Sequence, residues 1–225
     1  MKLSEDFALA LRDYRLLLNR GYPIPSTLKL VGDRYRLSHT ERMILFRGVL
    51  DDEKNEKIHM KLVSTLPKNA SLAIDGFNVL FTLINYRRGH PLFISTDGLL
   101  RDAGGAHGRI ERTEDWDWAR TLFCETLLHL PVGPLWVYLD APVSHSGEYR
   151  HEIEQNLKHH EAFVQVMLED CADIPLQTFT GTAIASSDST IALRCKTSIF
   201  DLARYILETS YHAQFLDVGA YTYET

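Results

Sequence analysis

The chain has 225 residues, 45% of them hydrophobic and 24% charged, and this composition is typical of a folded globular protein rather than a disordered one. No apolar run is long enough to cross a bilayer, and the N-terminal residues lack the apolar core of a signal peptide. The three cysteines lie far apart without a CxxC pair, which argues against a disulfide framework and a zinc ribbon, so we expect a cytoplasmic protein.

The net charge of −6 is unevenly distributed along the chain. Residues 1–68 hold 13 Lys and Arg against 9 Asp and Glu, a net charge of +4, and the remaining residues have a net charge of −10. A basic segment next to an acidic one suits a module that grips nucleic acid beside one that binds cations. Ordinary variation in surface charge explains the same numbers, so both interpretations stay open.

The N-terminal part of the chain predicts three short helices. Apolar residues recur at helical spacing in each, Ser26 is the expected cap of the second helix, and Ser38 with Glu41 forms a capping box before the third. We expect residues 1–67 to form a small basic helical domain whose arginines face solvent, and direct contact with RNA is the alternative. The charged stretch 51–57 predicts a turn or linker.

Beyond residue 67 short apolar runs alternate with helical stretches. We expect strands at 71–75, 92–96, 135–140 and 182–186, and helices at about 77–88, 115–130, 147–170 and 198–209. This alternation predicts an α/β domain over 68–225, with a largely parallel sheet and flanking helices. The carboxyl ends of parallel strands line one crevice, and ligands bind there in open α/β sheets.

An aspartate follows each of the four expected strands, namely Asp75, Asp97, Asp140 and Asp188. Carboxylates that meet at one sheet edge repel each other, so at least one pKa should rise. Mg²⁺ or Mn²⁺ would remove the conflict because both ions prefer oxygen ligands, and we therefore predict a metal site formed by these four residues. Aspartate is also common after strands as a turn residue or helix cap, so any one of them alone is explained without a metal.

Three segments resemble the PIN and NYN nuclease superfamily. IDGFNVL (74–80) is similar to its first strand and turn, and WVYLDAPVS (136–144) and IASSDSTI (184–191) are similar to its later acidic strands. The chain, including LKLVGDRYRL and STDGLLRDAGGAHG, also resembles an uncharacterised two-part family that joins a small helical domain to a PIN-like domain. The resemblance implies a metal-dependent nuclease, for which RNA is a more favoured substrate than single-stranded DNA.

The resemblance assigns roles to individual residues. It implies that Asp75, Asp140 and Asp188 bind the metal and act in catalysis, and that Asn78 orients a carboxylate or binds a phosphate. We add Ser187, which precedes Asp188, to the expected substrate contacts. If the enzyme interpretation holds, a water activated by Asp75 and a partner carboxylate attacks the phosphodiester.

The glycine-rich segment 101–112 is the expected mobile element at the substrate. Glycine permits a close approach of the backbone to a ligand, arginine matches phosphate bidentately, and histidine can shuttle protons. The substrate contacts expected here are Arg101, Asp102, His107, Arg109 and Arg112. An ordinary surface loop is the alternative. The superfamily often draws a further acid from a helix; this sequence has no clean match, so Asp97 or Asp102 is the expected substitute and the number of metal ions stays open.

The sequence lacks the motifs of several other enzyme classes. A HAD-type phosphatase needs a second aspartate two residues after Asp75, where Phe77 stands. The absence of GxGxxG after the first strand, of GxxxxGK[ST], and of a nucleophile elbow disfavours dinucleotide enzymes, P-loop enzymes and serine hydrolases. Two alternatives to a nuclease remain: a non-catalytic PIN-like module that binds RNA or protein, and a chain whose acidic site another subunit masks. A homodimer and a protein partner both stay open.

Overall fold

The structure, a computed structural model, describes residues 3–104 and 114–222, and the chain divides into two compact units. The first unit consists of Met1–Met60, Gly89–Ala106 and Gln214–Thr225, and the second of Lys61–Arg88 and His107–Ala213. Within the described residues, no helix is both long enough and apolar enough to cross a membrane.

The first unit combines helices with a small sheet. Its elements are α1 (Phe7–Asn19), α2 (Ile24–Arg34), α3 (His39–Gly48), α4 (Asp52–His59), β3 (Leu92–Ile94), β4 (Leu100–Asp102), β9 (Leu216–Asp217) and the 3₁₀ helix η1 (Gly219–Thr222). Strand β3 lies in the middle of the small sheet, antiparallel to β4 and parallel to β9. Fully buried Phe7, Leu11, Tyr14, Ile44 and Phe93 belong to one apolar core, which joins α1 and α3 to this sheet.

The helix starts in the first unit partly match the sequence predictions. The capping box of α3 is confirmed, because the Ser38 hydroxyl accepts from the N–H of Glu41 and the Glu41 carboxylate accepts from the N–H of Ser38. The prediction that Ser26 caps the second helix was wrong, since α2 begins at Ile24 directly after Pro23. Pro25 suits the first turn of α2 because its fixed φ is already helical and its missing N–H leaves no donor unsatisfied.

The prediction of a turn or linker at 51–57 was also wrong, because these residues belong to α4. The side chain of Asp51 caps this helix by accepting from the N–H of Lys54 at 3.0 Å. Acidic residues occupy the first turn of α4 and basic residues its last turn, an order that complements the helix dipole. Capping and charge order thus support a helix whose sequence has no apolar stripe.

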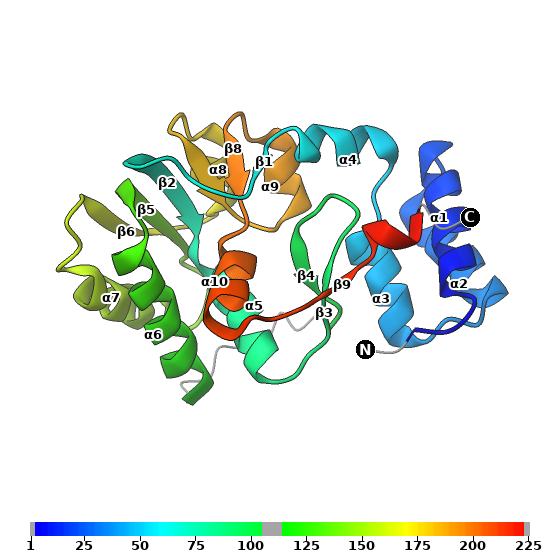
Figure 1. The fold of residues 1–225 in the computed structure, drawn as a ribbon, viewed down its shortest axis with the longest axis horizontal. Helices are drawn as coiled ribbons and strands as arrows, with labels where there is room; N and C mark the ends of the chain where they lie inside the picture. Colours follow the sequence, from blue (N-terminus) through cyan, green and yellow to red (C-terminus); the bar gives the residue numbers. More distant parts are fainter. Residues whose placement is uncertain (1–2, 105–113, 223–225) are drawn as a thin grey trace. The chain divides into compact units, whose positions relative to one another are not determined.

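The second unit contains a six-stranded sheet in which all strands are parallel (Figure 1). In spatial order its strands are β1 (Leu62–Val63), β8 (Ser198–Phe200), β7 (Ala183–Ala185), β2 (Ala70–Asp75), β5 (Val132–Asp140) and β6 (Val164–Glu169). Its helices are α5 (Gly76–Arg87), α6 (Glu114–His129), α7 (Ser146–Leu157), α8 (Asp173–Thr178), α9 (Ser189–Arg194) and α10 (Leu202–Tyr211). The predicted fold class, a parallel α/β sheet with flanking helices after a small helical region, is therefore confirmed.

Three predicted elements of this part of the chain were wrong in whole or in part. The expected helix 198–209 began too early, because residues 198–200 form β8 and α10 begins at Leu202. The expected helix 147–170 is α7 followed by strand β6, so the helical spacing of apolar residues beyond Leu157 was a coincidence within a strand. The expected strand 92–96 contains β3, which pairs with β4 and β9 in the small sheet of the first unit and not with the parallel sheet. Short strands show where an extended segment lies, but their sheet is decided by partners that are distant in sequence.

Lys61 and β1 close one side of the parallel sheet. The Lys61 ammonium donates to the carbonyl oxygens of Ala192 and, at 3.0 Å, Cys195, which lie at the C-terminal end of α9. A cation at this end of a helix is favourable because the last carbonyl groups have no partner within the helix. The carbonyl oxygen of Lys61 also accepts from the N–H of Ile199 at 2.8 Å. Lys61 therefore fixes the position of α9.

Gly76 allows α5 to begin directly against the neighbouring strand β5. A Cβ atom at this position would lie 2.5 Å from Cδ2 of Leu139 and 3.1 Å from the carbonyl oxygen of Tyr138. Both distances are shorter than ordinary van der Waals contact, so a side chain here would push the start of α5 away from the sheet. The glycine after Asp75 is thus explained by close packing.

We expect G76A to reduce the free energy of unfolding by about 1–3 kcal/mol, because overpacking at this contact forces the backbone to shift. The measurement is urea denaturation of the full chain. G147A is the matched control, since Gly147 also lies in the first turn of a helix but has no atom within 4 Å of its added Cβ. Equal midpoints for the two variants would contradict this account of Gly76.

Candidate functional site

Asp75 stands at the end of β2, between the ends of β7 and β5. It is only 7% exposed, and its Oδ1 accepts from the N–H of Asn78 at 3.3 Å, so it also caps α5. The hydroxyl of Ser186, the residue after β7, donates to its Oδ2 at 2.9 Å. The Ser186 oxygen in turn accepts from the N–H of Asp188 at 3.2 Å. One hydroxyl therefore connects two of the predicted acidic residues.

A second link joins the same two strand ends. The Oδ1 atom of Asn78 accepts from the N–H of Ser187 at 2.9 Å and from its hydroxyl at 3.0 Å. The structure thus brings Asn78 and Ser187, both predicted substrate contacts, into direct contact with each other. Together with the Ser186 bond to Asp75, this contact holds the loop after β7 against the start of α5.

Asp140 and Asp188 lie at the ends of the strands on either side of β2. Asp140 is the last residue of β5; it is half-buried, and its Oδ1 accepts from the N–H of Ala172 at 3.0 Å. Asp188 is exposed, and its Oδ1 caps α9 by accepting from the N–H groups of Thr190 at 2.6 Å and Ile191 at 3.1 Å. Asp75 and Asp188 therefore act as helix caps, as the alternative interpretation expected.

The pKa of Asp75 depends on burial and on the charges of Asp140 and Asp188. Burial raises the pKa of Asp75 from its ordinary value of 3.8 to about 7. The hydrogen bonds from Ser186 and from the N–H of Asn78 lower this pKa, and the negative charges of Asp140 and Asp188 raise it further. The loss of water and the neighbouring negative charges both raise the pKa of Asp75, as expected for carboxylates that lie at one sheet edge.

A fourth acid, Asp173, joins this group and was missed in the sequence. Asp173 is the first residue of α8, the helix that follows β6, and it is half-buried. Burial raises its pKa, and so do the negative charges of Asp188 and Asp140, while Arg194 lowers it. The sequence signal was obscured because 147–170 was interpreted as one helix, which hid the strand that places Asp173 near this sheet edge.

These acids do not form a closed metal cage. Among the described residues, no group of three His, Cys, Asp or Glu side chains is placed to hold a metal ion. Mg²⁺ suits such a site nonetheless, because it commonly binds to one or two carboxylates and completes its coordination with waters and substrate phosphates. The arrangement thus fits a hydrated cation with few protein ligands and does not fit zinc, whose structural sites use four.

Asp97 and Asp102 have partners within the first unit. Asp97 is fully buried, forms an ion pair with Arg101, and accepts a hydrogen bond from the hydroxyl of Ser95. Asp102 pairs with Arg47 at 3.1 Å, and Arg101 also donates to the carbonyl oxygen of Arg47 at 2.8 Å, near the C-terminal end of α3. The parallel sheet does not include the strand before Asp97, contrary to the prediction. Asp97, Arg101 and Asp102 are therefore engaged with one another and with Arg47 in the first unit.

The remaining predicted contacts, His107, Arg109 and Arg112, lie outside the described residues. Asp201, the residue after β8, caps α10 by accepting from the N–H of Arg204 at 3.0 Å.

Comparison with known families agrees with the two-part organisation. Residues 65–205 match the family described as "Domain of unknown function (DUF5616)". The chain belongs to this family. Residues 6–61 match a second family, "Protein of unknown function (DUF434)". The chain is also 31% identical over 183 residues to "Uncharacterized protein MJ0935" of Methanocaldococcus jannaschii, an alignment that covers 81% of this chain and 86% of the relative. No solved structure matches the chain.

The raised pKa of Asp75 predicts a specific dependence of stability on pH. The folded protein holds a proton on Asp75 up to about pH 7, whereas the unfolded chain releases it near pH 4, so stability falls as pH rises through this interval. D75N removes the titrating group. We expect the free energy of unfolding of D75N relative to wild type to increase between pH 4 and 7, by up to about 4 kcal/mol. Chemical denaturation in EDTA measures this difference, and a difference independent of pH would contradict it.

Proposed function

We propose that the chain is a divalent-metal-dependent nuclease of the PIN-like class that hydrolyses phosphodiester bonds, with RNA as the favoured substrate. The observation that carries the proposal is the group of aspartates after the three adjacent strands β7, β2 and β5. Asp75, the central member, is buried and has a pKa of about 7 that the charges of Asp140 and Asp188 help to raise. Perturbed carboxylates at the strand ends of an α/β sheet are candidates for a functional site.

A divalent cation relieves the repulsion among these carboxylates. Asp140 and Asp188 are the proposed ligands together with Asp75, and Asp173 is a further candidate because its charge interacts with both. When bound, the cation neutralises charge that develops on the phosphoryl group and makes water more acidic. The small number of close acids favours Mg²⁺ or Mn²⁺, which retain water ligands.

The residues of the chain then position and activate the attacking water. Asp75, the central carboxyl of the group, is the proposed acceptor of a proton from this water, together with a partner carboxylate. Ser186 and the N–H of Asn78 each bind one oxygen of Asp75 and so fix the direction of the carboxylate. The Asn78 amide, held through its Oδ1 by the N–H and hydroxyl of Ser187, is the proposed contact to the scissile phosphate.

RNA is favoured over single-stranded DNA by the resemblance of IDGFNVL, WVYLDAPVS and IASSDSTI to PIN and NYN nucleases. The order of these segments agrees with three adjacent strands of one parallel sheet. A non-catalytic module that binds RNA or protein is the second candidate. It is favoured by one observation, namely that no three acids among the described residues stand close enough to hold a metal ion together.

We expect D75N to reduce metal-dependent cleavage by at least about 100-fold, the lower end of the usual contribution of a general base. The assay uses labelled RNAs and single-stranded DNAs with Mg²⁺ or Mn²⁺, and with EDTA as the metal-free control. D201N is the matched variant, because Asp201 also follows a strand, caps a helix and is 9% exposed against 7% for Asp75. D201N should retain cleavage.

Two outcomes of this assay would count against the enzyme. Equal losses in D75N and D201N, with equal losses of stability, would mean that Asp75 is only a helix cap. Binding of RNA without cleavage under any metal condition would support the non-catalytic module.

Metal binding has a readout that does not depend on activity. We expect Mn²⁺ at pH 7.5 to raise the thermal midpoint of the wild-type chain by several degrees, since a ligand that binds only the folded state stabilises it. The shift should be lost in D75N and D140N and kept in D201N. An equal shift in all four proteins would place the cation elsewhere.

A further inference from the structure

Strand β6 has a free backbone edge. It is the last strand of the six-stranded sheet, and among the described residues only β5 pairs with it. In this ladder the N–H of Leu135 donates to the carbonyl oxygen of Phe163 at 2.8 Å. Because a parallel strand bonds its neighbour through every second residue, the peptide groups of Val164 and Val166 point away from β5, toward the free edge.

This edge lacks the features that usually keep edge strands from pairing. Residues 163–168 read FVQVML, with no charge and no proline. Lysine, proline or a bulge commonly protects an exposed edge, and an edge without them invites pairing with another strand. Phe163, at the start of the strand, is 58% exposed.

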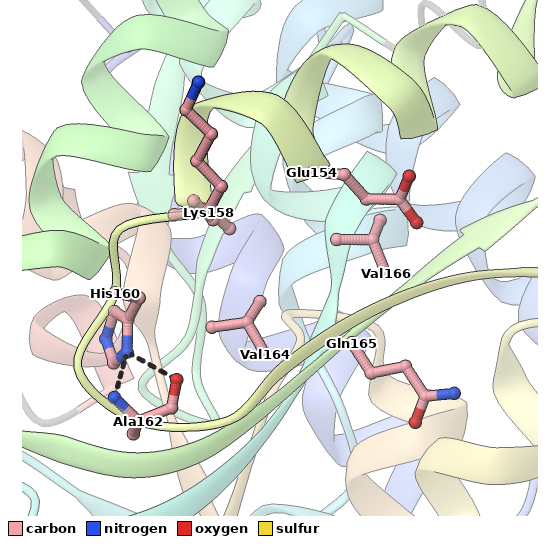
Figure 2. A pocket seen from close by; sticks show the side chains of 8 residues that line it. Glu154, Lys158, His160, Ala162, Val164, Gln165 and Val166 are labelled. Atoms are coloured by element: carbon pink, nitrogen blue, oxygen red, sulfur yellow. Dashed lines mark hydrogen bonds between the residues drawn. The ribbon is translucent and has the colours of Figure 1, made fainter.

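A pocket of about 290 Å³ runs beside the same edge, between α7 and β6. Figure 2 shows Val164 and Val166 on the strand, with Glu154 and Lys158 on the helix above them. The pocket borders the first half of β6, whereas the acidic site lies beyond the opposite ends of the strands, so the two features are separate. A pocket next to a free edge is the arrangement that accepts an added strand, whose side chains enter the pocket.

We propose that β6 pairs with β6 of a second copy of this chain, antiparallel and about a two-fold axis at Gln165. This register sets Val164 opposite Val166 of the second copy, so that the outward peptide groups of both residues exchange hydrogen bonds. Phe163 then lies opposite Met167 of the second copy, which covers its exposed ring. Each apolar residue at the edge thus faces an apolar residue.

The pairing of opposite charges near the two α7 helices favours a second copy over an unrelated strand, while the same register sets Glu161 opposite Glu169 of the second copy. The two-fold axis places α7 antiparallel to α7 of the second copy on the same face of the joined sheet. Glu154 on α7 and Lys158, the residue directly after α7, both line the pocket, so in this arrangement Glu154 would lie toward Lys158 of the other copy. Within the chain, Arg150 approaches Glu154 only to 3.7 Å. A two-fold interface of this kind uses the same surface twice and closes without exposing a new edge.

Analytical ultracentrifugation of the full chain tests the proposal. The wild-type chain should sediment as a dimer, with twice the chain mass of 25.7 kDa. K158E should raise the dimer dissociation constant by about tenfold, because it sets acidic side chains opposite each other in two symmetric places. The double variant E154K/K158E exchanges the charges and should restore the wild-type value.

A second variant tests the backbone pairing. V164P removes an N–H that the sheet does not use, so the monomer should keep its circular dichroism spectrum while the dimer is lost. V164T keeps the N–H and the branched side chain and should remain dimeric. A chain that is monomeric at all concentrations tested would show that β6 does not pair with a second copy, and would overturn the proposal. A dimer that survives both K158E and V164P would overturn it as well.

Discussion

The burial of the Asp75 carboxyl is the constraint on which the arrangement of this sheet edge depends. A carboxylate that is 7% exposed, with further carboxylates nearby, needs hydrogen bonds that hold it in place. Ser186 and the N–H of Asn78 supply them, but burial outweighs their effect on the pKa. The close start of α5 at Gly76 and the loop after β7 both serve this position, because each brings a donor to one oxygen of Asp75. An acid buried at a cost in stability above neutral pH is easier to explain by a chemical role than by a contribution to folding.

The parts of the site that the sequence predicted are those set by local signals. Asp75, Asp140 and Asp188 each follow a strand that is visible as an apolar run, and parallel pairing then brings neighbouring strand ends together. The same local signals also predicted caps, and both interpretations hold at once for Asp75 and Asp188, since one carboxylate can bind backbone N–H groups and still contribute charge to a cluster. The sequence alone therefore suggested the residues but not the balance between their structural and chemical roles.

The wrong predictions arose where the outcome depends on distant partners. Strand β3 pairs with the nearby β4 and with Leu216 and Asp217 of β9, more than 100 residues away, and no pattern within residues 92–96 reports either partner. Helical spacing continued by chance past Leu157, which hid β6 and with it Asp173. The contact between Ser186 and Asp75 spans 111 residues, so its donor could be recognised only after β7 and β2 were known to be neighbours.

Lys61 belongs to the segment that matches DUF434, but its side chain binds a helix within the segment that matches DUF5616. It is the last residue of the DUF434 match, β1 lies between this match and the one that begins at residue 65, and the Lys61 ammonium binds the end of α9. The opposite end of α9 is capped by Asp188. The boundary between the two families thus runs through a structural element of the α/β unit, and an α/β segment cut at the family boundary would lack both the cation and the outermost strand.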